Sequence, residues 1–244
     1  MRHDKFYGID GAKKATGLVI VIDIFRAATV AAFTLAKKAK YIIPVSTKEE
    51  ALILKKQNKN YLLVGEENGY KIPGFDFGNS PSELEHADLK NRIIVHRSSF
   101  GTQGILAAQK ANRIIFGSFP VLTAIVDYVK NKDIKQLSLV AMDGKGSEDE
   151  MFADFVIAKL NGRIIDINLI KKKLIKHKGV ERFLDPKQPE FPKEDLDLCL
   201  RLDLFNFVPL ISEERERKII KAYFNKVWNR VWRGEPGETR TLNQ

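Results

Sequence analysis

Short apolar runs alternate along most of this chain with segments whose apolar residues recur at helical spacing. The first run, residues 18–22, has apolar residues in succession and ends where polarity returns at Asp23. An uninterrupted, largely β-branched run is typical of a strand buried on both faces of a sheet. Residues 27–40 follow with Ala27 and Ala28 and predict a helix, so the alternation opens with a strand and a helix.

The same alternation continues to about residue 160. Further strands are predicted at 41–45, 61–64, 92–95, 113–116 and 136–141, and further helices at 102–110, 120–130 and 147–160. Thr47 and Ser147 occupy positions typical of helix N-caps, and Glu50 completes a capping box with Thr47. Alternating strands and helices predict an α/β domain of three layers, α/β/α, around a largely parallel or mixed sheet.

One loop interrupts this alternation. Residues 67–81, ENGYKIPGFDFGNSP, show neither helical nor strand periodicity, and loops of this length in compact domains are usually functional or disordered. The aromatic side chains of Tyr70, Phe75 and Phe77 argue against disorder. The glycines of the loop allow a ligand to approach the backbone closely.

The pattern changes beyond residue 160. Residues 163–177 and 195–202 have helical spacing, a proline-rich linker separates them, and a charged amphipathic helix is expected from Ser212. We therefore expect an α/β domain over residues 1–210, a helical C-terminal extension over 211–232, and a disordered polar tail over 233–244.

Composition narrows the function classes. No apolar run approaches the roughly 20 residues that span a bilayer, and the first residues lack the apolar core of a signal peptide, so we expect a cytoplasmic protein with no membrane partner. The net charge is +10, but the lysines lie in helix-like segments without a nucleic-acid recognition motif. We expect a solvated face, or a general attraction for anionic substrates, and no nucleic-acid partner.

Polar and glycine residues follow the predicted strands, where α/β proteins bind ligands. Asp23 and Arg26 share the first strand-to-helix turn, where they could hold a metal ion and an anion, or form a local ion pair that caps the helix. The later turns contribute Glu66, Asn79, Ser80, Ser98, Ser99, Gly101, Thr102, Ser118, Glu148 and Asp149.

These residue types favour metal-assisted chemistry on an anion. Small residues that lead into helix N-termini offer free backbone N–H groups to a phosphate, whereas clustered carboxylates repel it unless a divalent metal ion bridges them. A single cysteine, Cys199, and four histidines make a zinc cage improbable, so an oxygen-ligated Mg²⁺ is expected.

The order of several motifs adds specificity. The segments DIFRAAT, GEENGYKIPGFDFGNSP, SSFGT, GSF and SED, with DLDLCLRLDLFNFVP near the end, resemble the 2-phosphosulfolactate phosphatase (ComB-like) family over approximately residues 18–210. The resemblance implies a three-layer α/β fold. It also implies Mg²⁺-dependent hydrolysis of a small phosphorylated acid, 2-phosphosulfolactate, to sulfolactate and phosphate.

The resemblance also implies roles for the strand-end residues. Asp23 would be a Mg²⁺ ligand or a nucleophile, Arg26 would clamp the phosphate or sulfonate, and Glu66 would be a metal ligand or general base. Glu148 and Asp149 would complete the metal site, although acids in a first helical turn also stabilise the helix. The expected substrate-binding residues are Asn79, Ser80, Ser99, Gly101, Thr102 and Ser118; for these, turn formation or helix capping is the alternative.

The sequence departs from the family pattern at Phe100 and Val121, where the family usually has asparagine. The lost amides would remove hydrogen-bond donors to the substrate, and Arg97 could compensate for them. A second hypothesis follows, that the scaffold survives as a non-catalytic ligand-binding or regulatory homologue. The expected C-terminal helix could pack on its own domain or on a second subunit, which would make a homo-oligomer.

Overall fold

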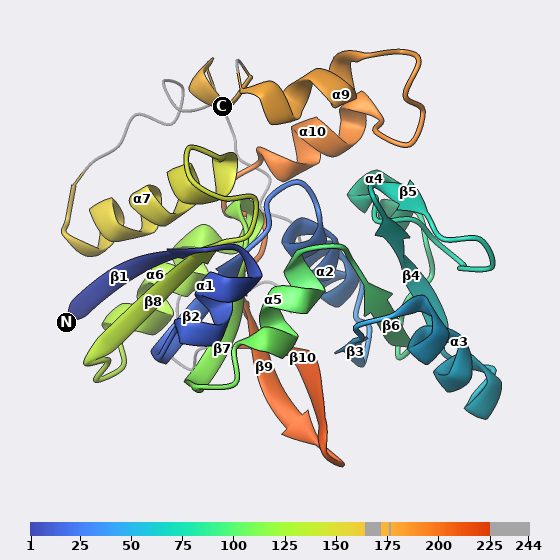
Figure 1. Cartoon of the computed structure of the whole chain (residues 1–244), viewed down its shortest axis with the longest axis horizontal. Coiled ribbons are helices and arrows are strands. Elements are labelled where there is room, and N and C mark those ends of the chain that lie inside the picture. The colour runs from blue at the N-terminus through green and yellow to red at the C-terminus, as the bar shows by residue number, and fades with distance from the viewer. Residues whose placement is uncertain (164–171, 176, 225–244) are drawn as a thin grey trace.

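The computed structural model describes residues 1–163, 172–175 and 177–224. Within these ranges, ten strands form one sheet in the order β1-β8-β2-β7-β9-β10-β3-β6-β4-β5 (Figure 1). The strands are β1 (Arg2–Tyr7), β2 (Gly17–Ile22), β3 (Tyr41–Pro44), β4 (Leu62–Glu67), β5 (Tyr70–Lys71), β6 (Ile93–Arg97), β7 (Ala111–Gly117), β8 (Gln136–Ala141), β9 (Val208–Glu214) and β10 (Arg217–Tyr223).

The sheet is mixed because a hairpin lies between two parallel groups of strands. Strands β1, β8, β2 and β7 are parallel to one another, and so are β3, β6 and β4. The β9–β10 hairpin is antiparallel to both groups, with Ile211 opposite Ile114 and Ile220 opposite Ile42. The predicted α/β architecture with a mixed sheet is confirmed.

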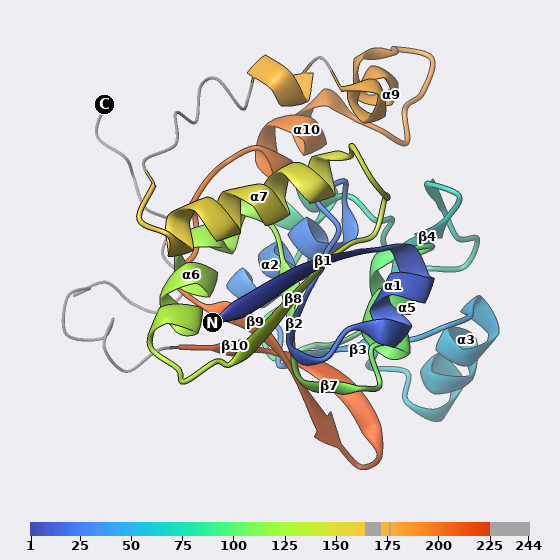
Figure 2. The ribbon, with the colours of Figure 1, turned by 60° about the vertical axis from the view of Figure 1, so that its left-hand side comes forward.

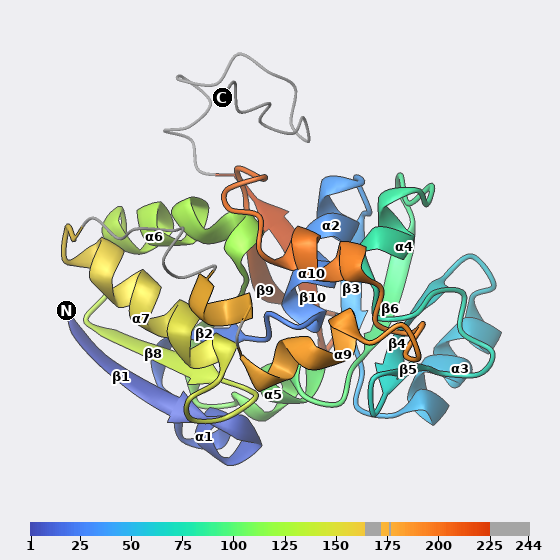
Figure 3. The ribbon, with the colours of Figure 1, turned by 90° about the horizontal axis from the view of Figure 1, so that it is seen from above.

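Helices cover both faces of the sheet and make the outer layers (Figures 2 and 3). One face carries α1 (Gly8–Lys14), α3 (Lys48–Gln57) and α5 (Gly101–Ala107); the other carries α2 (Ala27–Ala36), α4 (Pro81–Glu85), the short 3-10 helix η1 (Phe119–Val121), α6 (Leu122–Lys130) and α7 (Glu148–Leu160). Above α7 and α4 lies a segment that we call the C-terminal cap, residues 177–200, with η2 (Lys178–Val180), α9 (Glu181–Leu184) and α10 (Lys193–Cys199).

Strand β2 is at the centre of the first parallel group, between β8 and β7. Residues 18–22 are at most 3% exposed, which explains why this segment is apolar throughout rather than alternating. Helix α2 is equally enclosed, with small side chains that pack on both the sheet and α4. These elements hold the β2–α2 turn, which carries Asp23 and Arg26, rigidly at one end of the sheet.

The predicted N-caps are confirmed. Thr47 Oγ1 accepts a hydrogen bond from the Glu50 N–H at 3.1 Å, and Ser147 Oγ accepts one from the Glu150 N–H at 3.3 Å. The reciprocal bond of the capping box differs from the prediction, because Glu50 Oε2 accepts from the N–H of Ser46 and not from that of Thr47.

The C-terminal prediction is wrong over residues 212–223, which form most of the β9–β10 hairpin and no helix. The remainder of the expected extension and the expected tail over 233–244 lie outside the described residues. Of the expected helix over 163–177, residues 172–175 are helical, and 164–171 and 176 lie outside the described residues. No helix in the described ranges is long and apolar enough to cross a membrane.

Candidate active site

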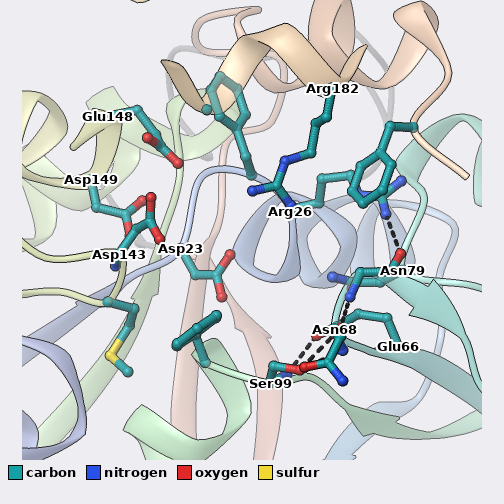
Figure 4. Close-up of a pocket in the computed structure, with 16 residues that line it drawn as sticks. Asp23, Arg26, Glu66, Asn68, Asn79, Ser99, Asp143, Glu148, Asp149 and Arg182 are labelled. Atoms are coloured by element: carbon teal, nitrogen blue, oxygen red, sulfur yellow. Dashed lines mark hydrogen bonds between the residues drawn. The ribbon is translucent and has the colours of Figure 1, made fainter. Parts of the chain in front are cut away.

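A pocket of about 260 Å³ opens where the ends of β2, β4, β6 and β8 face the C-terminal cap (Figure 4). Carboxylates gather around it, with guanidinium and aromatic groups from the cap side. Its lining consists of Asp23, Phe25, Arg26, Glu66, Asn68, Gly69, Asn79, Ser99, Phe100, Met142, Asp143, Glu148, Asp149, Gly179, Arg182 and Phe191.

Asp23 lies directly after β2 and is 8% exposed. Its Oδ1 accepts a hydrogen bond from the Ala27 N–H at 2.9 Å, which caps α2. Burial raises the pKa of Asp23 to about 7; the Ala27 and Gly101 N–H groups oppose this rise, and the carboxylates of Glu66 and Asp143 add to it. Asp23 therefore lies among other carboxylates, whose negative charges disfavour its ionised form.

Asp143, Glu148 and Asp149 lie together on one side of Asp23, in the β8–α7 turn and the first turn of α7 (Figure 4). Asp149 accepts hydrogen bonds from the backbone N–H groups of Ile24 at 2.8 Å and Asp143 at 3.0 Å, so it fastens the turns after β2 and β8 to each other. Burial is also the main cause that raises the pKa of Asp143 and of Asp149 above their usual values. The first turn of α7 thus brings carboxylates into the pocket, as the sequence predicts.

Glu148 is 3% exposed, and burial raises its pKa to about 7, with Asp143 adding to the rise. Within the described residues its Oε2 accepts no hydrogen bond. Nδ1 of His177 lies 3.2 Å from this oxygen. Because this nitrogen accepts a hydrogen bond from the Gly179 N–H, it offers Glu148 no proton in that tautomer. Glu148 therefore presents an oxygen that a cation can bind.

Glu66 closes the opposite side of the pocket, where β4 ends. Its Oε1 accepts from the Ser99 N–H at 2.5 Å, and its Oε2 accepts from the Gly69 N–H at 2.6 Å and from the Ser99 hydroxyl at 3.1 Å. The side chain therefore joins the loop after β4 to the turn after β6. A strand-end acid so fully hydrogen-bonded positions the turns around the pocket.

Arg26 is 4% exposed and is held from several directions. Its Nη1 donates to Asp195 Oδ2 at 2.6 Å and to the Glu190 carbonyl at 2.8 Å, while Nη2 donates to the Gly69 carbonyl at 3.2 Å. These bonds occupy both N–H groups of Nη1 and one of Nη2, which leaves the remaining edge of the guanidinium for a ligand. The ion pair of Arg26 is thus with Asp195 and not with Asp23, the partner in the alternative that the sequence left open.

Asn79 is oriented by a buried histidine. His96 Nε2 lies 3.0 Å from Asn79 Oδ1, and burial lowers the pKa of His96 to about 3, so the ring is neutral and donates from Nε2. This bond leaves the amide N–H groups of Asn79 for the pocket that the residue lines. His96 is therefore a buried core histidine that orients Asn79, while its Nδ1 makes no hydrogen bond within the described part of the chain.

The structure brings together many of the predicted site residues and excludes others from the pocket wall. Those that line it are Asp23, Arg26, Glu66, Asn79, Ser99, Glu148 and Asp149. Ser80, Gly101, Thr102 and Ser118 do not. Ser80 donates to Asp195 at 2.8 Å, Thr102 exchanges hydrogen bonds with Ser98, and Ser118 is fully buried.

Gly101 acts behind the pocket rather than on its surface. A Cβ at this position would lie 2.6 Å from Asp23 Oδ2 and 2.7 Å from the Phe116 ring, so only glycine lets α5 approach Asp23. The Gly101 N–H lowers the pKa of Asp23 by hydrogen bonding to it. The N–H groups of Gly101 and Thr102, at which the sequence predicts an anion site, are taken by Asp23 and Ser98.

The sequence prediction missed Asn68, Asp143 and Arg182. Asp143 follows β8 closely, so the rule that located Asp23 could have found it. Arg182 reaches the pocket from α9 in the cap, and no local pattern indicates this. Of the two departures from the family pattern, Phe100 lines the pocket and is 51% exposed, whereas Val121 is buried away from its wall.

The pocket's donors fit Mg²⁺. They are hard carboxylate oxygens, and Glu148 Oε2 is buried without a hydrogen bond in the described part of the chain. Among those same residues, no three His, Cys, Asp or Glu side chains converge closely enough to hold a metal ion by themselves. Mg²⁺ is usually held by one or two carboxylates together with waters and substrate phosphate, so this arrangement fits an ion shared with a ligand.

The fold and the pocket define an α/β protein in which guanidinium groups lie beside clustered carboxylates at the ends of the strands. The family model for 2-phosphosulpholactate phosphatase matches residues 8–214. A probable 2-phosphosulfolactate phosphatase of Thermoplasma volcanium is 35% identical over 219 residues, which cover 86% of this chain and 96% of that protein. One of Bacillus subtilis is 30% identical, covering 81% and 88%. The chain therefore belongs to the 2-phosphosulfolactate phosphatase family, and it is a phosphoric monoester hydrolase.

Proposed function

We propose that this protein is a Mg²⁺-dependent phosphatase that hydrolyses 2-phosphosulfolactate to sulfolactate and phosphate. The names of its relatives support the substrate. The observation that carries the proposal is that Asp23 and Arg26, on one turn, line a single pocket with Glu66, Asp143 and Glu148. An anion-binding guanidinium beside so many carboxylates is the arrangement that phosphoryl transfer with a divalent cation requires.

The reaction exchanges one bond at phosphorus for another. The P–O bond to the ester oxygen breaks, a P–O bond to a water oxygen forms, and one proton of that water ends on the ester oxygen. Arg26 would hold the phosphate through the guanidinium edge that its protein partners leave open, and Asn79 would donate from its amide. Both groups are fixed before the substrate arrives, which lowers the cost of orienting it.

Of the predicted metal ligands, Glu148 fits best, with Asp23 on the same pocket wall. Glu148 has an oxygen without a hydrogen bond in the described residues, whereas both oxygens of Glu66 and of Asp149 already accept N–H groups. When bound, Mg²⁺ would neutralise the carboxylates and the charge that develops on the phosphoryl oxygens. Glu66 and Asp149 would then act by holding the turns around the pocket in place.

The test is phosphate release from 2-phosphosulfolactate, with Mg²⁺ and with a chelator, by the purified protein and by Asp23→Asn. We expect Mg²⁺-dependent release that falls by at least about a hundredfold in the variant, because the substitution removes a charge at the reacting centre. Asp197→Asn, an exposed acid on α10, is the matched control and should keep full activity. Equal release by wild type and Asp23→Asn would overturn the proposal.

The attacking group is decided by a separate measurement. Attack by a water molecule gives no phosphoenzyme, whereas attack by the Asp23 carboxylate gives an aspartyl phosphate that acid quenching traps. The hypothesis of a non-catalytic homologue is not favoured, since the carboxylates and Arg26 are retained around the pocket. Phe100 replaces an amide on the pocket wall without displacing any of them.

A further inference from the structure

Two guanidinium groups share one aromatic ring above the pocket. The Cζ atom of Arg26 lies 4.7 Å from the centroid of the Phe191 ring, and that of Arg182 lies 5.0 Å from the same centroid. Cations stack favourably on aromatic faces, but two cations on one ring repel each other unless anions compensate their charges. The two arginines differ in how that compensation is supplied.

Arg26 is compensated within the protein. It is buried, and its partner Asp195 is a fully buried carboxylate at 2.6 Å. Arg182 is exposed, and no carboxylate in residues 1–163, 172–175 and 177–224 lies within 4.0 Å of its guanidinium. Its charge is therefore available to a ligand.

Arg182 nevertheless points at the reacting centre. Figure 4 shows its side chain extending from α9 into the pocket, toward the space beside Asp23 and Glu148. Asp143 and Glu148 line the same pocket as Arg182. If these acids hold a divalent cation, as the proposed function has it, Arg182 would be left to pair with an anion of the substrate.

We infer that Arg182 is a specificity-determining residue that binds an acidic group of the substrate other than its phosphate. This inference rests on the proposed function. Arg26, next to Asp23 and immobilised by Asp195, serves the phosphate, where fixed geometry matters most. Arg182, which lies over the Phe191 ring and is open to solvent, selects substrates with a second anion such as a sulfonate or carboxylate.

The experiment compares Arg182→Gln with wild type on two phosphate esters. One is 2-phosphosulfolactate, and the other is ethyl phosphate, which has no second acidic group. For 2-phosphosulfolactate we expect KM to rise about 10- to 100-fold with kcat changed less than about threefold, since one charge-assisted contact to the ground state is lost. For ethyl phosphate we expect both constants to stay within about twofold.

Two further variants separate this role from a structural one. Arg182→Lys keeps the charge without the planar fork, so its KM should lie between those of wild type and Arg182→Gln. Lys187→Gln removes an exposed cation from the same segment outside the pocket and should match wild type. An equal loss on both esters in Arg182→Gln would overturn the inference, as would an unchanged KM for 2-phosphosulfolactate.

Failure of the proposed function would give a different result. If wild type releases no phosphate from either ester, the phosphatase proposal fails, and calorimetric titration with sulfolactate still tests Arg182. Binding that weakens at least about tenfold in Arg182→Gln and not in Lys187→Gln would uphold the inference. Equal binding by all variants, or no binding by wild type, would overturn it.

Discussion

Arg26 and Asp195 form an ion pair of 2.6 Å in which both side chains are almost fully buried, although 169 residues separate them in the chain. The other oxygen of Asp195 accepts from the Ser80 hydroxyl and from the N–H and hydroxyl of Ser82. One carboxylate of the C-terminal cap therefore holds the β2–α2 turn and the N-terminal turn of α4 together. The position of the Arg26 guanidinium, for which we propose phosphate binding, depends on an element far away in sequence.

Removing the charge of Asp195 should cost both stability and activity. Asp195→Asn keeps the shape but leaves the Arg26 guanidinium buried without a counter-charge, which typically costs about 3–5 kcal/mol. We expect the free energy of unfolding to fall by about 3 kcal/mol in urea titration, and phosphate release to fall with it. Asp197→Asn on the same helix is exposed and should change the free energy by less than about 0.5 kcal/mol. A stable Asp195→Asn with full activity would contradict this account of Arg26.

A methyl group at Gly101 should disturb Asp23 directly. Gly101→Ala would place a Cβ 2.6 Å from Asp23 Oδ2, so either the carboxylate or α5 must move. Misplacement of a reacting group by about 1 Å can cost about a hundredfold in rate, and we expect that loss in kcat/KM. Gly78→Ala is the control, since its Cβ would meet the flexible end of Glu83 at 3.2 Å and would otherwise make ordinary contacts with the Lys71 side chain. Similar rates in the two variants would show that the close approach at Gly101 is unimportant.

His96 should make the fold sensitive to acid. Its pKa is about 3 in the folded protein, because of burial, and about 6.5 when unfolded, so below about pH 6.5 the unfolded chain binds more protons. The contribution of His96 is present in full above that pH and is lost as the pH falls toward 3. The free energy of unfolding should therefore drop by about 1.4 kcal/mol per pH unit from this residue alone.

The measurement is urea unfolding at pH 7.0, 6.0 and 5.0. His96→Gln cannot take up the proton, so its stability should decline less steeply with acid than that of wild type. His86→Gln, an exposed histidine, should leave the wild-type slope intact. Parallel slopes for wild type and His96→Gln would mean that His96 accepts its proton in the folded state.

The turn of the β9–β10 hairpin should gain stability from substitution. Arg215 and Glu216 have φ angles of 50° and 62°, in the left-handed region that favours glycine and asparagine. Arg215→Asn combined with Glu216→Gly should stabilise the protein by about 1–2 kcal/mol and raise Tm by roughly 2–4 °C per kcal/mol. The control, Arg215→Ala with Glu216→Ala, removes the same side chains and keeps both Cβ atoms. An equal rise in Tm for the control would show that backbone conformation is not the cause.

The missed hairpin shows where local pattern fails. A two-residue hairpin turn is usually predicted from Asn-Gly or a similar pair, but here the turn is Arg215-Glu216. The flanking residues are charged and carry few apolar positions, such as Ile211, Ile219 and Ile220, so their spacing suits a helix as well as a strand. These residues form strands because they pair with β7 and β3. Each parallel group leaves an edge there that only a strand can complete.

The sequence by itself determined the α/β alternation and the buried strand before Asp23. It also determined the acids that lie at the ends of β2 and β4 and at the start of α7. It could do so because burial demands apolar runs, and because the polar residues after strands collect at the edge where ligands bind. Only the tertiary structure decided that Asp195 holds Arg26, that Gly101 supports Asp23, and that Arg182 enters the pocket. These contacts join segments far apart in the chain. Hydrophobic periodicity and helix or strand propensity are local properties, so they do not predict which distant side chains will meet.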